Sequence, residues 1–197
     1  MHPYAVDSAE RKNFAYLFAI LSISLILVIQ QVLVYFSISL PWFICIPSPF
    51  VVFRTLWFFF DRYFWKFPMF YSVGLVKTPN LSGEWYGNLQ SSYDKYHTTH
   101  QISLEIHQNW TNISLFLHSN TSSSKSEVAS IYINNPTGPV VNYQYLNDPN
   151  PKTPGSMHIH RGTTSLRYNA SKNTLEGSYY TDGKRKNSGK IRLERDK

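Results

Sequence analysis

Residues 80–197 contain 13 of the chain's 19 lysine and arginine residues and 9 of its 14 tyrosines, and the formal net charge of the chain is +7. Cationic side chains hold anionic oxygens, lysine as a point charge and arginine as a planar fork. Aromatic rings among such cations are surfaces on which nucleobases stack. These residue types therefore predict a site for an anionic ligand with aromatic rings. The predicted ligand-binding residues are Tyr93, Lys95, Tyr96, Tyr145, Lys152, Tyr179, Thr181, Lys184, Arg185 and Lys186.

The elements that must position these residues follow from a period of two. Apolar and polar side chains alternate through residues 80–197 in runs bounded by turn residues, as in β-strands with one buried face. Short connections favour an up-and-down antiparallel meander, and eight strands is the number at which such a sheet closes into a small barrel. The expected fold of this domain is an all-β, lipocalin-like barrel; an open sandwich is the alternative. The predicted strands are 82–91, 98–108, 112–119, 127–133, 140–147, 156–168, 173–181 and 187–195.

In this meander, alternate loops share one rim of the barrel. The longer loops, which carry six lysine and arginine residues, are expected at the rim away from the membrane, where binding usually resides. A single lysine in a loop is ordinarily a solubilising side chain, so the prediction rests on their gathering at one rim. Gly162 is expected to form a bulge or bend in a long strand. The rim loops are 91–99, 119–126, 147–155 and 181–188.

The opposite end of the barrel is expected to be closed by Trp85 and Arg195. Trp85 belongs to a Gly-x-Trp at the start of the first strand, and Arg195 shares the inward parity of Ile191 and Leu193 in the last strand. Because the first and last strands are antiparallel neighbours in a closed meander, the two side chains are predicted to meet. Their expected role is structural, as a barrel plug.

Two apolar stretches precede the barrel. Residues 14–36 carry no charge, and residues 41–62 carry Arg54 within their apolar part. About 20 apolar helical residues cross a bilayer, so each stretch is long enough to span. The first exceeds the h-region of a signal peptide, about 7–15 residues. Pro47 and Pro49 interrupt the hydrogen-bond ladder of the second, and Arg54 is expected to snorkel toward its charged end.

The basic residues around these stretches predict the topology. Arg11 and Lys12 precede the first stretch, cations follow the second, and the connection carries none. The positive-inside rule then places both termini and the barrel in the cytoplasm, as a two-pass inner-membrane protein. Five N-x-S/T sequons leave open the alternative of one span and an exterior barrel. The predicted segments are a tail at 1–13, spans at 14–36 and 41–62, an aromatic and basic linker at 63–79, and the barrel at 80–197.

No pattern in the sequence predicts catalysis, a metal site or a cofactor. The histidine pairs at 97 and 100 and at 158 and 160 lack accompanying cysteine or carboxylate ligands. The only cysteine, Cys45, lies in a predicted span, so the barrel is expected to have no disulfide. The cationic run 184–186 is too short to predict a DNA or RNA partner.

The whole chain resembles the two-span β-barrel effectors of bacterial cyclic-oligonucleotide-based anti-phage signalling (CBASS). The resemblance is carried by the double span with basic flanks, the aromatic segment after it, and the barrel motifs at 81–87 (LSGEWYG), 175–181 (LEGSYYT) and 188–193 (SGKIRL). It implies that a partner nucleotidyltransferase, linked only through its product, makes a cyclic dinucleotide that the barrel binds as activating ligand. The spans then self-associate and disrupt the lipid bilayer, and the infected cell dies.

Two other functions remain open at this point. One is a membrane-tethered, lipocalin-like carrier of an apolar ligand, which the cationic rim disfavours. The other is a membrane-bound enzyme such as an isomerase with histidine acid–base groups, which the lack of a paired acid–base constellation disfavours. The expected protein is thus an effector that a ligand switches and that performs no catalysis.

Overall fold

The computed structural model describes residues 1–39, 47–150, 158–182 and 186–195. It forms two compact units. Met1–Asp7 and Thr78–Lys197 make the barrel unit, and Ser8–Lys77 make the helical unit. The chain therefore begins in the barrel, leaves it for the helical unit and returns.

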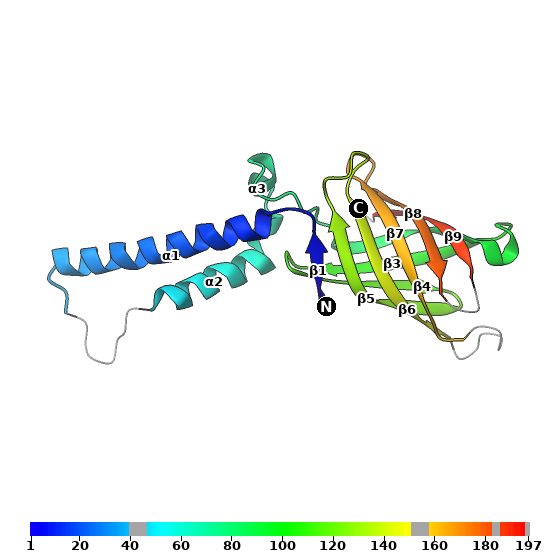
Figure 1. Cartoon of the computed structure of the whole chain (residues 1–197), viewed down its shortest axis with the longest axis horizontal. Helices are drawn as coiled ribbons and strands as arrows, with labels where there is room; N and C mark the ends of the chain where they lie inside the picture. The colour runs from blue at the N-terminus through cyan, green and yellow to red at the C-terminus, as the bar shows by residue number, and fades with distance from the viewer. Residues whose placement is uncertain (40–46, 151–157, 183–185, 196–197) are drawn as a thin grey trace. The chain divides into compact units, whose positions relative to one another are not determined.

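The barrel unit is a closed, almost entirely antiparallel sheet (Figure 1). Eight consecutive strands follow the meander that the alternating pattern predicts, each paired with its sequence neighbour, and the first pairs with the last. They are β2 (Gly83–Ser91), β3 (Thr99–Gln108), β4 (Asn112–Ser119), β5 (Ser122–Tyr132), β6 (Val140–Pro149), β7 (His160–Asn169), β8 (Thr174–Thr181) and β9 (Ser188–Arg195).

A ninth strand, β1 (His2–Val6), enters this sheet between β4 and β5. It is antiparallel to β4, with His2 opposite Ile113, and parallel to β5, with Tyr4 opposite Ala129. The prediction of eight strands, with residues 1–13 as a tail, is therefore wrong. A meander of eight strands closes with every pair antiparallel; an inserted ninth strand must run parallel to one of its neighbours, here β5.

The insertion separates β4 from β5 over half their length. The two strands pair directly only beside their turn, from Phe116 opposite Lys125 to His118 opposite Ser123. Below these pairs the hydroxyl of Ser126 accepts from the backbone N–H of Leu115 at 3.0 Å. From there β5 is irregular, with a shift of register against β6, and the gap between the two strands holds β1. We call this gap the β1 site.

The closed end of the barrel is filled by Trp85 and its neighbours. Trp85 is fully buried, and its indole N–H donates to the Leu81 carbonyl at 3.0 Å. The Arg195 guanidinium lies 4.4 Å from the indole ring, and it donates to the Asn80 carbonyl at 2.7 Å. The contact predicted between Trp85 and Arg195 is present, because these residues are paired across β2 and β9.

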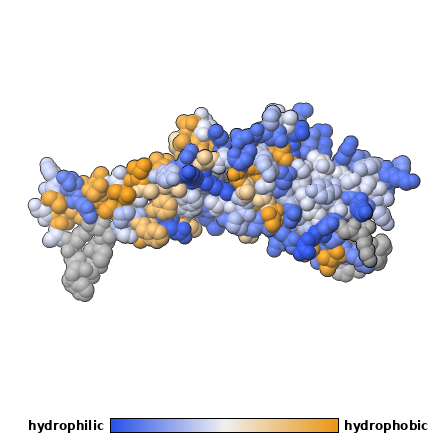
Figure 2. Space-filling view, viewed as in Figure 1, coloured by the Kyte–Doolittle hydropathy of each residue, from blue (hydrophilic) through white to orange (hydrophobic). Residues whose placement is uncertain are grey.

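The helical unit contains one helix long and apolar enough to cross a membrane among the described residues. It is α1 (Glu10–Tyr35), which has 26 residues. Apolar side chains cover nearly its whole circumference: Ile20 and Leu27, for example, are 64 % and 59 % exposed. A helix that is apolar on every side requires lipid or a large protein around it, and Figure 2 shows the apolar surface concentrated on the helices rather than on the barrel.

The prediction of a second span-length helix over residues 41–62 is not borne out in the described residues. Helix α2 (Pro49–Arg62) has 14 residues and a length of about 21 Å. Pro49 does not interrupt it: it occupies the first turn, where the missing N–H costs nothing, and the Ser48 side chain accepts from Val51. Residues 40–46 lie outside the described residues.

Aromatic rings hold α1 and α2 together. Phe14 of α1 lies 4.3 Å from Phe60 of α2 between ring centres, and Phe18 contacts Phe60 and Trp57. Short helices η1 (Phe64–Lys66) and α3 (Pro68–Ser72) follow. The two ends of the unit are joined by the buried Glu10 carboxylate, which accepts from the backbone N–H of Lys77 at 2.7 Å.

Candidate ligand-binding cavity

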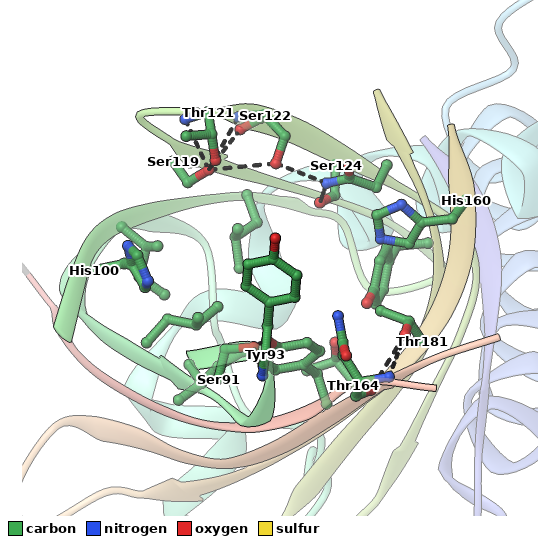
Figure 3. Close-up of a pocket in the computed structure, with 18 of the residues that line it drawn as sticks. Ser91, Tyr93, His100, Ser119, Thr121, Ser122, Ser124, His160, Thr164 and Thr181 are labelled. Carbon is green, nitrogen blue, oxygen red and sulfur yellow. Dashed lines mark hydrogen bonds between the residues drawn. The ribbon is translucent and has the colours of Figure 1, made fainter. Parts of the chain in front are cut away.

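The barrel opens at the end opposite Trp85 into a cavity of about 330 Å³ (Figure 3). The ends or beginnings of eight strands, β2 to β9, surround it, at the rim where the sequence places the longer loops. The side chains that line it, together with apolar ones, are Ser91, Tyr93, His100, Gln101, Ser119, Asn120, Thr121, Ser122, Ser124, Tyr143, Tyr145, Asn147, His160, Thr164, Tyr179, Thr181 and Asn187.

One wall of the cavity is the β4–β5 hairpin. Its turn is only Asn120 and Thr121, and the Ser119 hydroxyl accepts from the backbone N–H of Ser122 at 3.1 Å. The prediction of a long loop at 119–126 is wrong, because the serine-rich run forms the start of β5. Ser122, Ser124 and Ser126 are buried, and Lys125 between the last two is exposed. The period of two expected of a strand is therefore present, but in polar residues.

Two tyrosines are directed into the cavity by glycines on the neighbouring strand. Tyr145 of β6 is opposite Gly162 of β7, and Tyr179 of β8 is opposite Gly189 of β9. A Cβ atom at either glycine would overlap the facing tyrosine side chain. The predicted bulge at Gly162 is therefore absent, because the register of β7 is regular there. The glycine instead makes room for the aromatic ring of Tyr145.

Hydrogen bonds also fix the hydroxyl groups of Tyr179 and Tyr143. The Tyr179 hydroxyl donates to the Ser91 hydroxyl at 3.0 Å. Burial raises the pKa of the Tyr143 phenol to about 12, and a hydrogen bond with the Thr164 side chain opposes this effect. Tyr143 is therefore a neutral phenol at physiological pH.

Asn147 is the most buried amide of the cavity, with 7 % of its surface exposed. Its side-chain nitrogen lies 3.0 Å from the Ser122 hydroxyl and 3.1 Å from the Ser124 hydroxyl. Its side-chain oxygen has no hydrogen-bond partner among the described residues. A buried polar atom that the protein leaves unpaired is costly, and one beside a cavity is a natural contact for a ligand.

The described lining residues include no lysine, arginine, aspartate or glutamate. The ionisable groups other than tyrosine are His100 and His160, which lie on opposite sides of the cavity with Tyr93 between them in the view of Figure 3. The Asp94 carboxylate lies 3.7 Å from the His100 ring nitrogen. The interior can thus offer aromatic faces, hydroxyls and amides to a polar ligand.

The structure brings together part of the predicted site. Tyr93, Tyr145, Tyr179 and Thr181 line the cavity, whereas Lys95, Tyr96 and Lys186 are exposed and do not. Lys125, which the sequence places in a rim loop, instead lies on the outer face, 5.8 Å from the Phe116 ring centre. The remaining three predicted residues, Lys152, Lys184 and Arg185, lie outside the described residues.

Sequence reasoning missed the serines of β5, Asn147, Thr164 and the two histidines. Only their alternating parity within strands marks them, because neutral polar residues are equally common in loops. Of the predicted ring of cations, Lys95 and Lys186 are exposed and do not line the cavity, Lys125 lies on the outer face, and Lys152, Lys184 and Arg185 lie outside the described residues.

Comparison with known families agrees with a ligand-binding barrel. Residues 76–195 match the family model described as Cap15, cyclic dinucleotide receptor domain. The match spans β2 to β9 and every strand that lines the cavity. No curated protein sequence matches the chain.

Proposed function

The chain belongs to the Cap15 cyclic dinucleotide receptor family, and we propose that it is an anti-phage effector whose barrel binds a cyclic dinucleotide and thereby activates its membrane segment. The observation that carries this proposal is the cavity itself. It lies inside the matched domain, and aromatic rings, hydroxyls and amides line it. Such groups suit the bases and sugars of a nucleotide better than they suit an apolar chain.

The size of the cavity indicates how the ligand is held. Ligand sites typically occupy about 300–1,000 Å³, so a cavity of about 330 Å³ accepts part of a cyclic dinucleotide. We expect a base to stack against Tyr145 or Tyr179, because stacking on an aromatic ring contributes about 1–3 kcal/mol per base. The phosphates then lie nearer the mouth, within reach of hydroxyls, His100 and the peripheral lysines.

The path of the chain supports a two-pass topology. Both ends of the helical unit continue into the same barrel unit, at Asp7 and at Thr78. A barrel cannot lie on both sides of a bilayer, so if α1 crosses the membrane, the chain must cross back before Thr78. We propose that this return includes α2. The cations Arg11 and Lys12 before α1, and Arg62 and Lys66 after α2, favour the cytoplasm for both termini and for the barrel.

Activation is proposed to proceed by self-association. A ligand shifts an equilibrium only by its different affinity for two states, and an assembled state is the simplest one that gathers several helical units. Arg54 lies on the exposed side of α2, among the exposed side chains of Val51 and Phe58. Several such arginines in one assembly favour water and headgroups within the bilayer, which is the proposed cause of inner-membrane disruption and cell death.

Calorimetric titration of the full chain in detergent tests the binding step. The titrants are the cyclic dinucleotides formed by all pairings of adenine, guanine and uracil, with a long-chain fatty acid as comparison. Saturable heat with at least one cyclic dinucleotide, recovered unchanged afterwards, is the expected result. Heat from the fatty acid alone would instead identify a carrier of apolar ligands.

A further inference from the structure

The N-terminal strand β1 pairs with strands that are distant from it in the sequence. Its partners β4 and β5 lie more than a hundred residues away, and its own ladder is short. Only Asp7, Ser8 and Ala9 separate it from α1. β1 is therefore a small element whose place in the barrel depends entirely on contacts between distant parts of the chain.

The β1 site is nevertheless specific for this sequence. Tyr4 is the anchor: its side chain is 3 % exposed, and its hydroxyl donates to the Trp110 carbonyl at 2.8 Å and accepts from the Gln108 amide at 3.2 Å. At one end the His2 ring nitrogen lies 2.8 Å from the Ser126 hydroxyl.

A carboxylate clamp completes the site at the other end. The Asp7 carboxylate accepts from the backbone N–H groups of Ile133 and Asn134, at 2.6 and 3.1 Å. The Asn134 side chain donates in turn to the Asp7 carbonyl at 2.7 Å. These contacts distinguish the residues of β1 from an arbitrary extended segment.

We propose that neighbouring copies of the chain exchange β1, so that the β1 site is the interface through which the protein self-associates. A second copy presents an identical strand, and every contact of Tyr4, His2 and Asp7 can be remade in its barrel. Exchange of an identical element is a low-cost route to assembly. Confinement to one membrane further favours it, since it raises the effective concentration of neighbours. This inference rests on the proposed function, for which it supplies the contact.

The geometry also indicates the type of assembly. If each chain donates β1 to the next and receives one from the previous, the contact is head-to-tail, and such contacts build rings or filaments rather than only dimers. The three-residue connection spans about 10 Å when extended, so only adjacent copies can exchange. Each exchange therefore holds the beginning of one α1 beside the barrel of another chain.

The cavity is linked to the β1 site through the β4–β5 hairpin. Leu117 and Ser124 line the cavity and are paired with each other. The hydroxyl of Ser126, two residues beyond Ser124, forms hydrogen bonds with the backbone N–H of Leu115 and with the His2 ring at the start of β1. A ligand that moves this hairpin changes the contacts of β1, and this is the route by which binding promotes exchange.

Cysteine cross-linking between differently tagged chains tests the exchange. Ala5 and Ser130 are directly paired, Ala5 exposed and Ser130 partly exposed, so cysteine at either leaves the core intact. Full-length Ala5→Cys and Ser130→Cys chains, each also Cys45→Ser, are mixed in one liposome and oxidised with each cyclic dinucleotide of the panel. A covalent heterodimer is expected at least fivefold more abundant with the bound dinucleotide than without it.

The matched control is Ser178→Cys mixed with Lys190→Cys, a pair of exposed residues on β8 and β9 that exchange does not involve. Equal linkage of the control pair would reveal collision and overturn the inference. So would absence of the Ala5–Ser130 heterodimer in liposomes where light scattering or an amine cross-linker detects ligand-induced assembly; the proposed function would then stand. If no dinucleotide binds or induces assembly, the proposed function fails and the exchange fails with it.

Discussion

The hydroxyl of Tyr4 lies 3.2 Å from the side-chain nitrogen of Gln108, and this contact joins the N-terminal strand to the end of β3. The same nitrogen donates to the Pro79 carbonyl at 3.1 Å, and the Gln108 oxygen accepts from the Leu81 backbone N–H at 2.8 Å. The buried amide of Gln108 thus binds β1, which precedes the helical unit, and residues 79–81, which follow it.

Tyr4→Phe is expected to weaken the seating of β1. The substitution removes the hydroxyl that donates to the Trp110 carbonyl, and it costs about 1–2 kcal/mol in the free energy of unfolding. Hydrogen exchange of residues 2–6 in the full chain should accelerate more than exchange in β8. Tyr132→Phe, an exposed tyrosine of β5, is the control, and equal effects of the two substitutions would contradict this role for Tyr4.

Neighbouring tyrosines of β8 provide a test of the cavity. Tyr179 lines it, whereas Tyr180 is 58 % exposed on the other face of the strand. Tyr179→Ala is expected to weaken cyclic dinucleotide binding about tenfold or more, because it removes a stacking surface. Tyr180→Ala should change affinity less than twofold. Calorimetry on both variants checks this, and a loss of affinity limited to Tyr180→Ala would place the ligand outside the barrel.

Substitutions at Asn147 and Lys186 compare the contribution of a buried amide to ligand binding with that of an exposed charge. Asn147→Leu is expected to weaken binding at least tenfold, because it removes the buried amide that Ser122 and Ser124 orient. Lys186→Gln should cost about two- to threefold at low salt and nothing at high salt, since exposed charges are screened. A larger, salt-dependent loss in Lys186→Gln than in Asn147→Leu would restore the cationic rim as the principal site.

Arg54→Leu is expected to uncouple membrane damage from binding. Arg54 belongs to the helical unit, so its replacement should leave the affinity for cyclic dinucleotide unchanged and reduce permeabilisation severalfold. The measurement is propidium uptake by cells that express the variant beside an active synthase. Arg62→Leu, at the end of α2, is the matched charge control. Full permeabilisation by Arg54→Leu would refute the role proposed for this residue.

Much of the barrel was predictable, because apolar and polar residues alternate along a β-strand that has one buried face. Ile102, Leu104 and Ile106 of β3 alternate inward as expected, and the contact of Trp85 with Arg195 followed from strand parity. Strand β1 was not predictable in this way. Its five residues include a proline, and its partners are distant in the sequence, so no local pattern records the pairing.

The candidate site was predictable in most of its tyrosines and at Thr181, but not in the rest of its lining. Tyr145 and Tyr179 follow the inward parity of their strands, and the glycines opposite them explain why the rings fit. Lysines were expected in the site because charge suggests anion binding, but Lys95 is exposed and outside the cavity. The sequence predicts a loop where the first serines of β5 lie, because a hydroxyl that faces a polar cavity gives no hydrophobic alternation.

Dye release from liposomes tests the central claim most directly, because it requires the cavity and the helical unit to act together. The full chain is reconstituted with a trapped fluorophore, and the cyclic dinucleotide that gives the highest affinity in calorimetry is added. Release that rises with occupancy of the cavity in wild type, and that Tyr179→Ala shifts to at least tenfold higher ligand concentration, is the predicted result. Release that is equal with and without the dinucleotide, or that is unchanged in Tyr179→Ala, would contradict the account.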